Sequence, residues 1–394
     1  MKIALCQINP TVGAINNNKK QIIDWYDRAV EADADIVVFP ELSVIGYPPQ
    51  DLLHRKGFIK KAQDALDEIA QLSTVPLILG STFSEGELLY NCSFVCEAGG
   101  IIGHYKKMLL PTYDVFDEDR YFESGDKPVV VDLTIKDEKR KVGLQICEDL
   151  WDSKYSCDLA SELKANGAEL IINISASPYR VERLVDRSSI IQEKVKNIGI
   201  PFLYCNIVGA QDELIFDGQS LAYNGSNQLI GQGKAFVEDL VMVDLKSKKV
   251  LSLKVEERSA KIYGALVLGV RDYFRKTGHA QAVLGLSGGI DSSLTACIAV
   301  DALGSENVHG VSMPSEYSSV HSKDDAQALA GQLDIDYSVI PIVSTVESFN
   351  DALSDSFQNM DKGVAEENIQ ARVRGALLMA LSNKHGWLVL STGN

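Results

Sequence analysis

The stretch DIVVFPELSVIGYPP, residues 35–49, decides the fold class of the first part of the chain. It opens with a continuous apolar run, and ELIINIS at residues 169–175 has the same form. Strands without polar alternation are typical of a sheet that is covered on both faces. Working outward from these runs, we predict an α/β fold. We expect strands at residues 3–8, 35–41, 77–82, 91–97, 129–133, 142–147, 170–175 and 202–208, and helices at residues 17–32, 58–72, 155–165 and 180–197.

The remaining sequence predicts a second domain after a linker. Residues 218–245 are Gly-rich with polar alternation, which indicates hairpins at the end of a first domain spanning residues 1–245. Residues 246–260 are mostly polar and charged and predict a linker, and residues 261–394 form the second domain. Strands that alternate with helices imply a doubly wound parallel sheet there. We expect helices at residues 261–276, 291–303, 320–333 and 366–384, and strands at residues 282–286, 308–313, 337–342 and 387–391.

The composition of the chain argues against some kinds of binding partner. The chain has 394 residues, 45% hydrophobic and 23% charged, with a formal net charge of −16. An acidic chain is a poor electrostatic match for nucleic acid or for an anionic membrane surface. No stretch of about 18 apolar residues predicts a membrane span, and seven cysteines without a Cys-x-x-Cys pair favour neither disulfides nor zinc. We therefore expect a cytoplasmic protein, a homo-oligomer, whose partners are small molecules.

Three reactive side chains lie where apolar runs end. Glu41 follows DIVVFP, Cys147 ends KVGLQIC, and Lys107 lies in HYKKMLLP. A buried carboxylate suits proton transfer, and a cysteine at a strand-to-turn elbow can act as a thiolate nucleophile. A lysine can stabilise the oxyanion that such an attack creates. Taken alone, Glu41 also fits a solvated loop glutamate, and Lys107 fits a surface charge.

The three segments FPELSVIGY, YKKMLLPTYDVFDEDRYF and GLQICEDLW together resemble the nitrilase, or carbon–nitrogen hydrolase, superfamily. The resemblance covers residues 1 to about 245 and implies an αββα sandwich. It also implies an amidase in which Glu41 is the general base, Lys107 stabilises the intermediate and Cys147 is the nucleophile.

The segment PTYDVFDE is similar to the glutaminase branch of that superfamily. In that branch, the resemblance implies that Tyr113, Ser177 and Arg183 bind glutamine. The segment SPYRVER holds two arginines that fit the last role, so Arg180 stays open beside Arg183.

The second domain contains the segment AVLGLSGGIDSSLTACIAV, residues 282–300. Gly288 and Gly289 allow the backbone to approach a ligand closely, and the free amides at the start of the following helix favour an anion. Ser292 and Ser293 add hydroxyl groups, and Asp291 suits a magnesium ion. The Walker sequence GxxxxGK[ST] is absent, so the segment is not a P-loop of that kind.

The string SGGIDSS resembles the pyrophosphate-binding loop of the ATP pyrophosphatases, and the segments VSMPSEYSSVHSKDDAQALA and EENIQARVRGALLMALSNKHGWLVLSTGN resemble the NAD synthetases among them. A nitrilase-type domain in front is similar to the glutamine-dependent members. The resemblance implies that Asn368 and Arg372 bind deamido-NAD and that Asp291 binds Mg2+. Taken alone, Glu367, Gln370 and Arg374 on the helix expected at residues 366–384 fit a solvated face. The implied ATP-binding residues are Gly285, Leu286, Ser287, Gly288, Gly289, Ile290, Asp291, Ser292, Ser293 and Thr392.

The implied reaction has two stages: hydrolysis of glutamine to ammonia, and ATP-dependent amidation of deamido-NAD to NAD, the product, with release of AMP and pyrophosphate. Two alternatives remain, a stand-alone amidase with a nucleotide-binding second domain and a nucleotide-sensing module without enzyme activity. The NAD synthetases continue beyond the STGN segment with a magnesium-binding glutamate and a second phosphate loop. We therefore expect the second domain to be incomplete, and a polypeptide of these 394 residues to make no NAD while its glutaminase domain still turns over slowly.

Overall fold

The computed structural model describes residues 1–358, 360–361 and 363–392. The chain divides into two compact units, Met1–Ala265 and Leu266–Asn394. The boundary falls within helix α5 (Arg258–Thr277), after a stretch without helix or strand that follows strand β14 (Asp239–Asp244). Each unit has its own sheets and its own apolar core.

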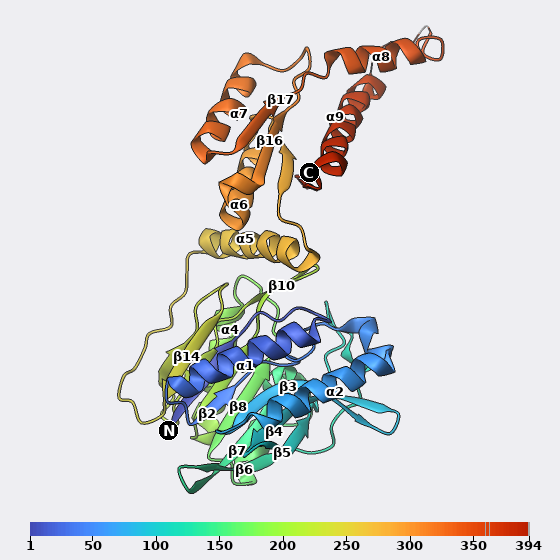
Figure 1. The fold of residues 1–394 in the computed structure, drawn as a ribbon. Helices are drawn as coiled ribbons and strands as arrows, with labels where there is room; N and C mark the ends of the chain where they lie inside the picture. Colours follow the sequence, from blue (N-terminus) through green and yellow to red (C-terminus); the bar gives the residue numbers. More distant parts are fainter. Residues whose placement is uncertain (359, 362, 393–394) are drawn as a thin grey trace. The chain divides into compact units, whose positions relative to one another are not determined.

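Two six-stranded sheets form the centre of the first unit (Figure 1). The first sheet has the order β14-β1-β2-β3-β4-β5, and the second has the order β13-β12-β9-β8-β7-β6. The first sheet contains β1 (Lys2–Gln7), β2 (Ile36–Val38), β3 (Leu77–Glu85), β4 (Leu88–Glu97) and β5 (Gly100–Lys106). The second contains β6 (Val130–Ile135), β7 (Glu138–Ile146), β8 (Leu170–Ser175), β9 (Phe202–Asn206), β12 (Leu221–Tyr223) and β13 (Leu229–Gln232). A separate hairpin pairs β10 (Val208–Gln211) with β11 (Leu214–Asp217).

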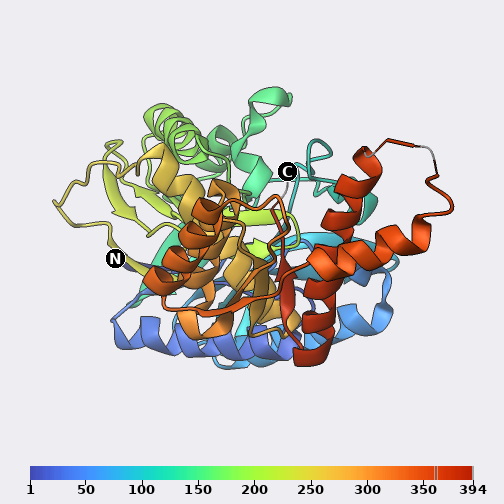
Figure 2. The ribbon, with the colours of Figure 1, turned by 90° about the horizontal axis from the view of Figure 1, so that it is seen from above.

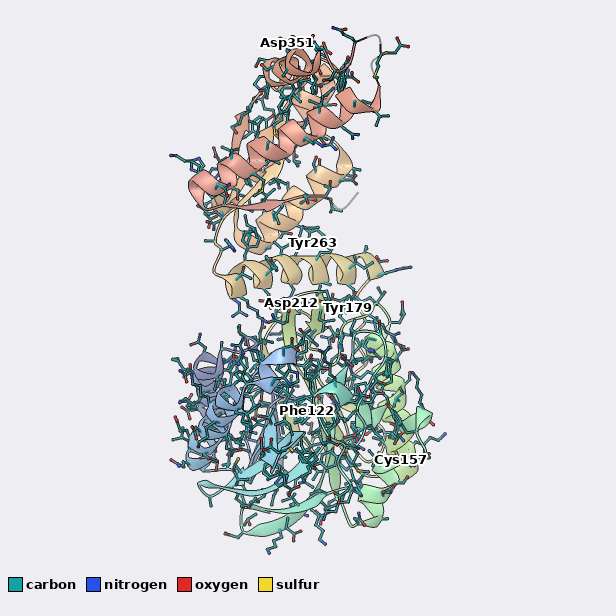
Figure 3. The ribbon with its side chains drawn as sticks, turned by 90° about the vertical axis from the view of Figure 1, so that its right-hand side faces the viewer. Phe122, Cys157, Tyr179, Asp212, Tyr263 and Asp351 are labelled. Atoms are coloured by element: carbon teal, nitrogen blue, oxygen red, sulfur yellow. The ribbon has the colours of Figure 1, made fainter. Side chains whose placement is uncertain are left out.

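Helices cover the outer face of each sheet. Helices α1 (Ile15–Glu31) and α2 (Lys56–Gln71) pack on the first sheet, and α3 (Leu159–Ala165) and α4 (Arg183–Ile198) pack on the second. Figure 2 shows the blue helices α1 and α2 and the green helix α4 on opposite sides of the strands. An apolar core lies between the two sheets, and Figure 3 shows side chains filling the space between the layers. The expected αββα sandwich is confirmed.

The second unit contains a four-stranded parallel sheet in the order β17-β16-β15-β18. Helices α6 and α7 pack on one face, and helices α8 and α9 pack on the other. The expected doubly wound architecture is confirmed for the described part of this unit. Its strands are β15 (Ala282–Gly285), β16 (Val308–Ser312), β17 (Asp336–Val339) and β18 (Leu388–Leu390), and its helices are α6 (Ile290–Leu303), α7 (Val320–Leu333), α8 (Val343–Leu353) and α9 (Val364–His385).

Strand β5, the hairpin of β10 and β11, and helix α8 were not expected from the sequence. Strand β5 pairs with β4 through a tight turn in which Ala98 and Gly99 both have positive φ angles, 52° and 81°. That geometry belongs to a two-residue hairpin, for which the Ala-Gly pair is a weak signal. Among the described residues, no helix is long and apolar enough to cross a membrane.

Gly80 on β3 lets this strand lie directly against the turn that follows β2. A Cβ atom at Gly80 would lie 2.2 Å from the backbone nitrogen of Leu42 and 2.7 Å from the Cα atom of Glu41. Only a residue without a side chain fits at that distance. The backbone that carries Glu41 is therefore fixed by the strand beneath it.

We predict that Gly80→Ala lowers the free energy of unfolding by about 3 kcal/mol or more, because the new methyl group overlaps backbone atoms that cannot move away. The control is Gly57→Ala, inside α2, where a Cβ atom has no neighbour within 4 Å. It should be neutral or stabilise by up to about 1 kcal/mol. Urea unfolding measures both, and equal stability of the two variants would contradict the packing described.

Candidate active sites

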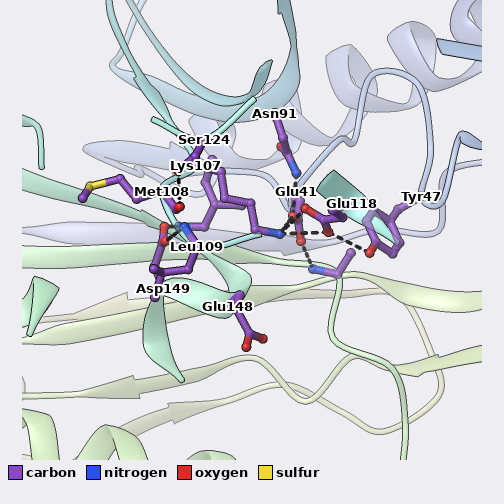
Figure 4. A network of polar contacts seen from close by, with 12 residues as sticks. Glu41, Tyr47, Asn91, Lys107, Met108, Leu109, Glu118, Ser124, Glu148 and Asp149 are labelled. Atoms are coloured by element: carbon purple, nitrogen blue, oxygen red, sulfur yellow. Dashed lines mark hydrogen bonds and ion pairs between the residues drawn. The ribbon is translucent and has the colours of Figure 1, made fainter. Parts of the chain in front are cut away.

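Glu41 lies in the turn after β2 and is fully buried. Its Oε1 atom accepts hydrogen bonds from Asn91 Nδ2 at 2.8 Å and from Lys107 Nζ at 2.7 Å. Its Oε2 atom accepts one from the backbone N–H of Ala176 at 2.8 Å. Three donors from three different strands or strand ends thus fix the position of this carboxylate (Figure 4).

Lys107 follows β5 and is fully buried as well. Its ammonium group donates to Glu41 and to both carboxylate oxygens of Glu118, at 2.9 and 2.8 Å. Burial, the largest single influence, disfavours the charge, but the attraction of Glu118 and Glu41 together holds the pKa of Lys107 well above its ordinary value. Lys107 is therefore a fixed, permanently charged ammonium group, and the interpretation as a surface charge is wrong.

Glu118 is a member of this cluster that the sequence analysis missed. It begins the short 3-10 helix Glu118–Arg120, is 6% exposed, and accepts a hydrogen bond from Tyr47 Oη at 2.8 Å. Burial raises the pKa of its carboxyl group. The acidic segment DVFDEDRYF is indistinguishable in sequence from a solvated loop, and only the fold brings this one carboxylate to Lys107.

Cys147 is the first residue after β7 and opens the 3-10 helix Cys147–Leu150. Its φ angle is +41°, a left-handed backbone conformation that is uncommon for residues other than glycine. This conformation produces a sharp turn, or elbow, at Cys147. Burial, reinforced by the charge of Glu41, raises the pKa of the thiol well above its ordinary value. The resting thiol is therefore protonated, and a base must remove its proton before it can attack.

Asp149 locks this elbow against the end of β5. Its carboxylate accepts hydrogen bonds from the backbone N–H of Ile146 at 2.8 Å, from Tyr105 Oη at 2.8 Å and from the backbone N–H of Leu109 at 3.1 Å. Burial raises its pKa to about 7. One carboxyl group thus ties the turn of Cys147 to the segment that follows Lys107.

Glu148, the neighbour of Cys147, is 2% exposed and was also missed. Its carboxylate accepts hydrogen bonds from Tyr113 Oη at 3.0 and 2.9 Å and from Tyr155 Oη at 3.2 Å. Burial raises the pKa of Glu148. The structure therefore brings Tyr113, expected to bind glutamine, to the residue beside Cys147.

The other expected glutamine-binding residues follow β8. Ser177 is 2% exposed and lies one residue beyond the N–H group that binds Glu41. Arg183 places its guanidinium group 4.7 Å from the ring centre of Trp151, which follows the elbow helix. Arg180 is exposed and pairs with Asp186 at 3.3 Å. These placements favour Arg183 over Arg180 as the third of the expected glutamine-binding residues.

The second unit has a loop between β15 and α6. Gly288 has a φ angle of +79°, and a Cβ atom there would lie 2.2 Å from the carbonyl oxygen of Ser322. Ser292 and Ser293, expected to offer hydroxyl groups, donate them to the carbonyl oxygen of Gly289 at 3.0 and 2.9 Å. Those bonds close the first turn of α6 and leave its leading backbone amides as the donors for an anion.

A cavity of about 710 Å³ lies beside this loop. Of the expected ATP-binding residues, the cavity is lined by Gly285, Leu286, Ser287, Gly289, Asp291, Ser292 and Thr392. Within the described residues, the lining does not include Gly288, Ile290 or Ser293, and Ile290 is 80% exposed.

Helix α9 contributes other residues to the cavity than those expected. Asn368 and Arg372 are exposed and are not among its described lining residues. Arg374 lines it instead and donates a hydrogen bond from Nε to the carbonyl oxygen of Met313 at 3.1 Å. Arg374 fitted a solvated helix face in sequence, and only the packing of α9 shows otherwise.

Asp291 is the acidic residue of the described cavity lining. Within residues 1–358, 360–361 and 363–392, no group of three or more His, Cys, Asp or Glu side chains could hold a metal ion. A carboxylate beside open space suits a Mg2+ ion that arrives with phosphate oxygens and water as its other ligands.

Comparison with known proteins gives a family match for each of the two units. The carbon-nitrogen hydrolase family matches residues 2–254, and the NAD synthase family matches residues 262–394. The glutamine-dependent NAD(+) synthetase of Synechocystis is 42% identical, over 100% of this chain and 74% of that protein. That of Thermotoga maritima is 40% identical, with the same two shares. The chain belongs to the glutamine-dependent NAD(+) synthetase family.

A solved structure of a member of this family has the same fold. The glutamine-dependent NAD+ synthetase from Acinetobacter baumannii, in complex with adenosine diphosphate, matches with a TM-score of 0.94 and 39% identity. The match covers 100% of this chain and 74% of that chain.

We predict that Glu118→Gln lowers kcat for glutamine hydrolysis roughly tenfold or more, because Lys107 loses one of its two charged partners and its position. The matched control is Glu85→Gln, which removes the exposed carboxylate that pairs with the neighbouring Lys106 at 2.8 Å. Glutamate release measures both variants. Equal rates would show that Glu118 does not hold Lys107 in its working position.

Proposed function

We propose that this chain releases ammonia from glutamine at Cys147 and uses ATP to amidate deamido-NAD to NAD, with AMP and pyrophosphate as the other products. The observation that carries the first half is the buried Lys107 ammonium group, held by Glu41 and Glu118. The family membership carries the second half, since members share both units.

In the first half-reaction, Glu41 takes the thiol proton of Cys147, and the sulfur attacks the side-chain amide carbon of glutamine. The charge that develops on the carbonyl oxygen lies in a dry site, where the Lys107 ammonium group stabilises it. Glu41 returns the proton to the amide nitrogen, and the carbon–nitrogen bond breaks. Ammonia leaves, and the glutamyl group stays on Cys147 as a thioester. Water, deprotonated by Glu41, then hydrolyses the thioester and releases glutamate and the thiol.

Glutamine also carries an α-ammonium and an α-carboxylate group that must be recognised. Glu148, buried beside Cys147, has the charge that complements the ammonium group, and the guanidinium group of Arg183 complements the carboxylate. Tyr113 and Ser177 supply hydroxyl groups. This arrangement favours a free amino-acid amide over a simple aliphatic amide.

In the second half-reaction, the leading backbone amides of α6 would hold the phosphates of ATP, and Asp291, which lines the cavity, would hold a Mg2+ ion that offsets their charge. Thr392 lines the same cavity, and Arg374 and Lys323 provide positive charge there. Asn368 and Arg372 stay proposed as contacts to deamido-NAD outside that cavity. ATP adenylates the nicotinate carboxylate with loss of pyrophosphate, and ammonia then displaces AMP.

The alternative of a stand-alone amidase has less support, because the relatives match over both units and are NAD(+) synthetases. The cytoplasmic location, the homo-oligomeric state and the domain limits 1–245, 246–260 and 261–394 stay predictions. The experiments below measure each site separately.

We predict that Cys147→Ala abolishes glutamate release from glutamine and leaves ATP binding unchanged, because the nucleophile serves the first half-reaction alone. The matched control is Cys157→Ala, a partly exposed cysteine of the same unit, which should retain wild-type hydrolysis. Glutamate released by Cys147→Ala at the wild-type rate would contradict the assignment of the nucleophile.

We predict that Mg-ATP raises the thermal stability of the wild-type chain and that Asp291→Asn weakens this effect. A ligand at about 100 times its Kd adds about 2.7 kcal/mol to the free energy of unfolding. The control is Asp301→Asn, at the other end of α6. An equal ATP-induced shift of Tm in both variants would exclude Asp291 from the ATP site, and glutamate release should be unchanged in both.

A further inference from the structure

Two consecutive backbone N–H groups follow β8, and they bind different acceptors. The N–H of Ala176 donates to Oε2 of Glu41 at 2.8 Å, and the N–H of Ser177 donates to Oδ1 of Asn206 at 3.0 Å. One turn therefore connects the proposed general base to a side chain at the end of the neighbouring strand β9. Asn206 has no part in the reaction described above.

The side chain of Asn206 is held in turn from its other end. Its Nδ2 atom donates to Asp217 Oδ1 at 3.2 Å and to the carbonyl oxygen of Gly218 at 2.9 Å. Asn206 and Asp217 are 0% and 1% exposed. This residue must accept at one end and donate twice at the other, which an amide does and a carboxylate or an aliphatic side chain does not.

A buried ion pair anchors the chain of hydrogen bonds. Arg187 on α4 is 0% exposed and donates from Nη2 to Asp217 Oδ1 at 3.1 Å and from Nη1 to the carbonyl oxygen of Gly218 at 3.2 Å. Gly218 lies directly against the side chain of Gln7, since a Cβ atom at Gly218 would lie 2.2 Å from Gln7 Nε2. The path from α4 to Glu41 therefore runs through fixed groups at each step.

We propose that Asn206 is a positioning residue for glutamine hydrolysis, an inference that rests on the proposed function. Its amide fixes the turn at Ala176 and Ser177, so that one N–H orients Glu41 and the next residue presents its side chain to glutamine. Because the whole path is out of contact with water, no solvent hydrogen bond replaces a broken link. Loss of Asn206 disturbs the base and the binding residue together.

The test compares three variants of the full chain by their kcat and KM for glutamate release. Asn206→Ala removes the acceptor of the Ser177 N–H, and we expect kcat to fall roughly 10- to 100-fold with a raised KM. Ser177→Ala keeps its backbone bond to Asn206 and should raise KM with kcat within about threefold of wild type, an expectation that follows from a loss of binding alone.

The matched control is Tyr223→Phe. It removes a buried hydrogen bond of 2.6 Å to Ser188, which lies beside Arg187 on α4, and it leaves the path to Glu41 intact. Both kinetic constants should stay at their wild-type values. The alkylation rate of Cys147 by iodoacetamide, followed by mass spectrometry, gives a readout without substrate, and it should fall in Asn206→Ala only.

Wild-type kcat and alkylation rate in a folded Asn206→Ala protein would overturn the proposal. If that variant does not fold, Asp217→Asn takes its place, because it keeps the acceptor oxygen and removes only the charge that pairs with Arg187. A lowered kcat with a lowered alkylation rate supports the proposal, and wild-type values of both overturn it. Absence of glutaminase activity in the wild-type chain would instead contradict the proposed function itself.

Discussion

The buried ammonium group of Lys107, shared between Glu41 and Glu118, is the interaction on which the first unit depends. Removing an ion from water costs several kcal/mol unless close partners compensate, and here two carboxylates within 2.9 Å do so. Two carboxyl groups face one ammonium group, so Lys107 does not depend on Glu41 alone, and Glu41 is available as a base next to a thiol that needs one. Glu41 follows β2, Lys107 follows β5 and Glu118 begins a 3-10 helix, so the charges also tie two strand ends to a loop.

Much of the fold could be predicted from the sequence, because continuous apolar runs and the alternation of strands with helices are both local features of the chain. Continuous apolar runs such as ELIINIS predicted buried strands, and the sandwich and the doubly wound sheet are both confirmed. The missed elements have weak local signals. Strand β5 contains two glycines, Gly100 and Gly103, which are uncommon in strands, and none of the described residues of α8 is buried.

The site was only partly visible in the sequence, because its remaining members are brought together by contacts between distant segments. Glu41 follows an expected apolar strand and Lys107 lies in a segment with a family resemblance, so both could be found. Glu118, in contrast, lies in an acidic loop whose sequence indicates a solvated segment. Asn206 is the last residue of a strand of ordinary composition, and its partner Ser177 is far away in sequence. Arg374 illustrates the same limit in the second unit, since a helix sequence does not say which face covers a cavity.

The most direct test of the role of Lys107 is the rate of glutamyl-thioester formation at Cys147, measured by rapid quenching and mass spectrometry. The informative protein is Lys107→Met/Glu118→Leu, which removes one positive and one negative charge and so keeps the net charge of the cluster. We expect a lowered Tm, because Glu41 stays buried without the Lys107 ammonium group, and thioester formation roughly 100-fold slower or more in the protein that remains folded. Thioester formation at the wild-type rate in this variant would contradict the role of Lys107.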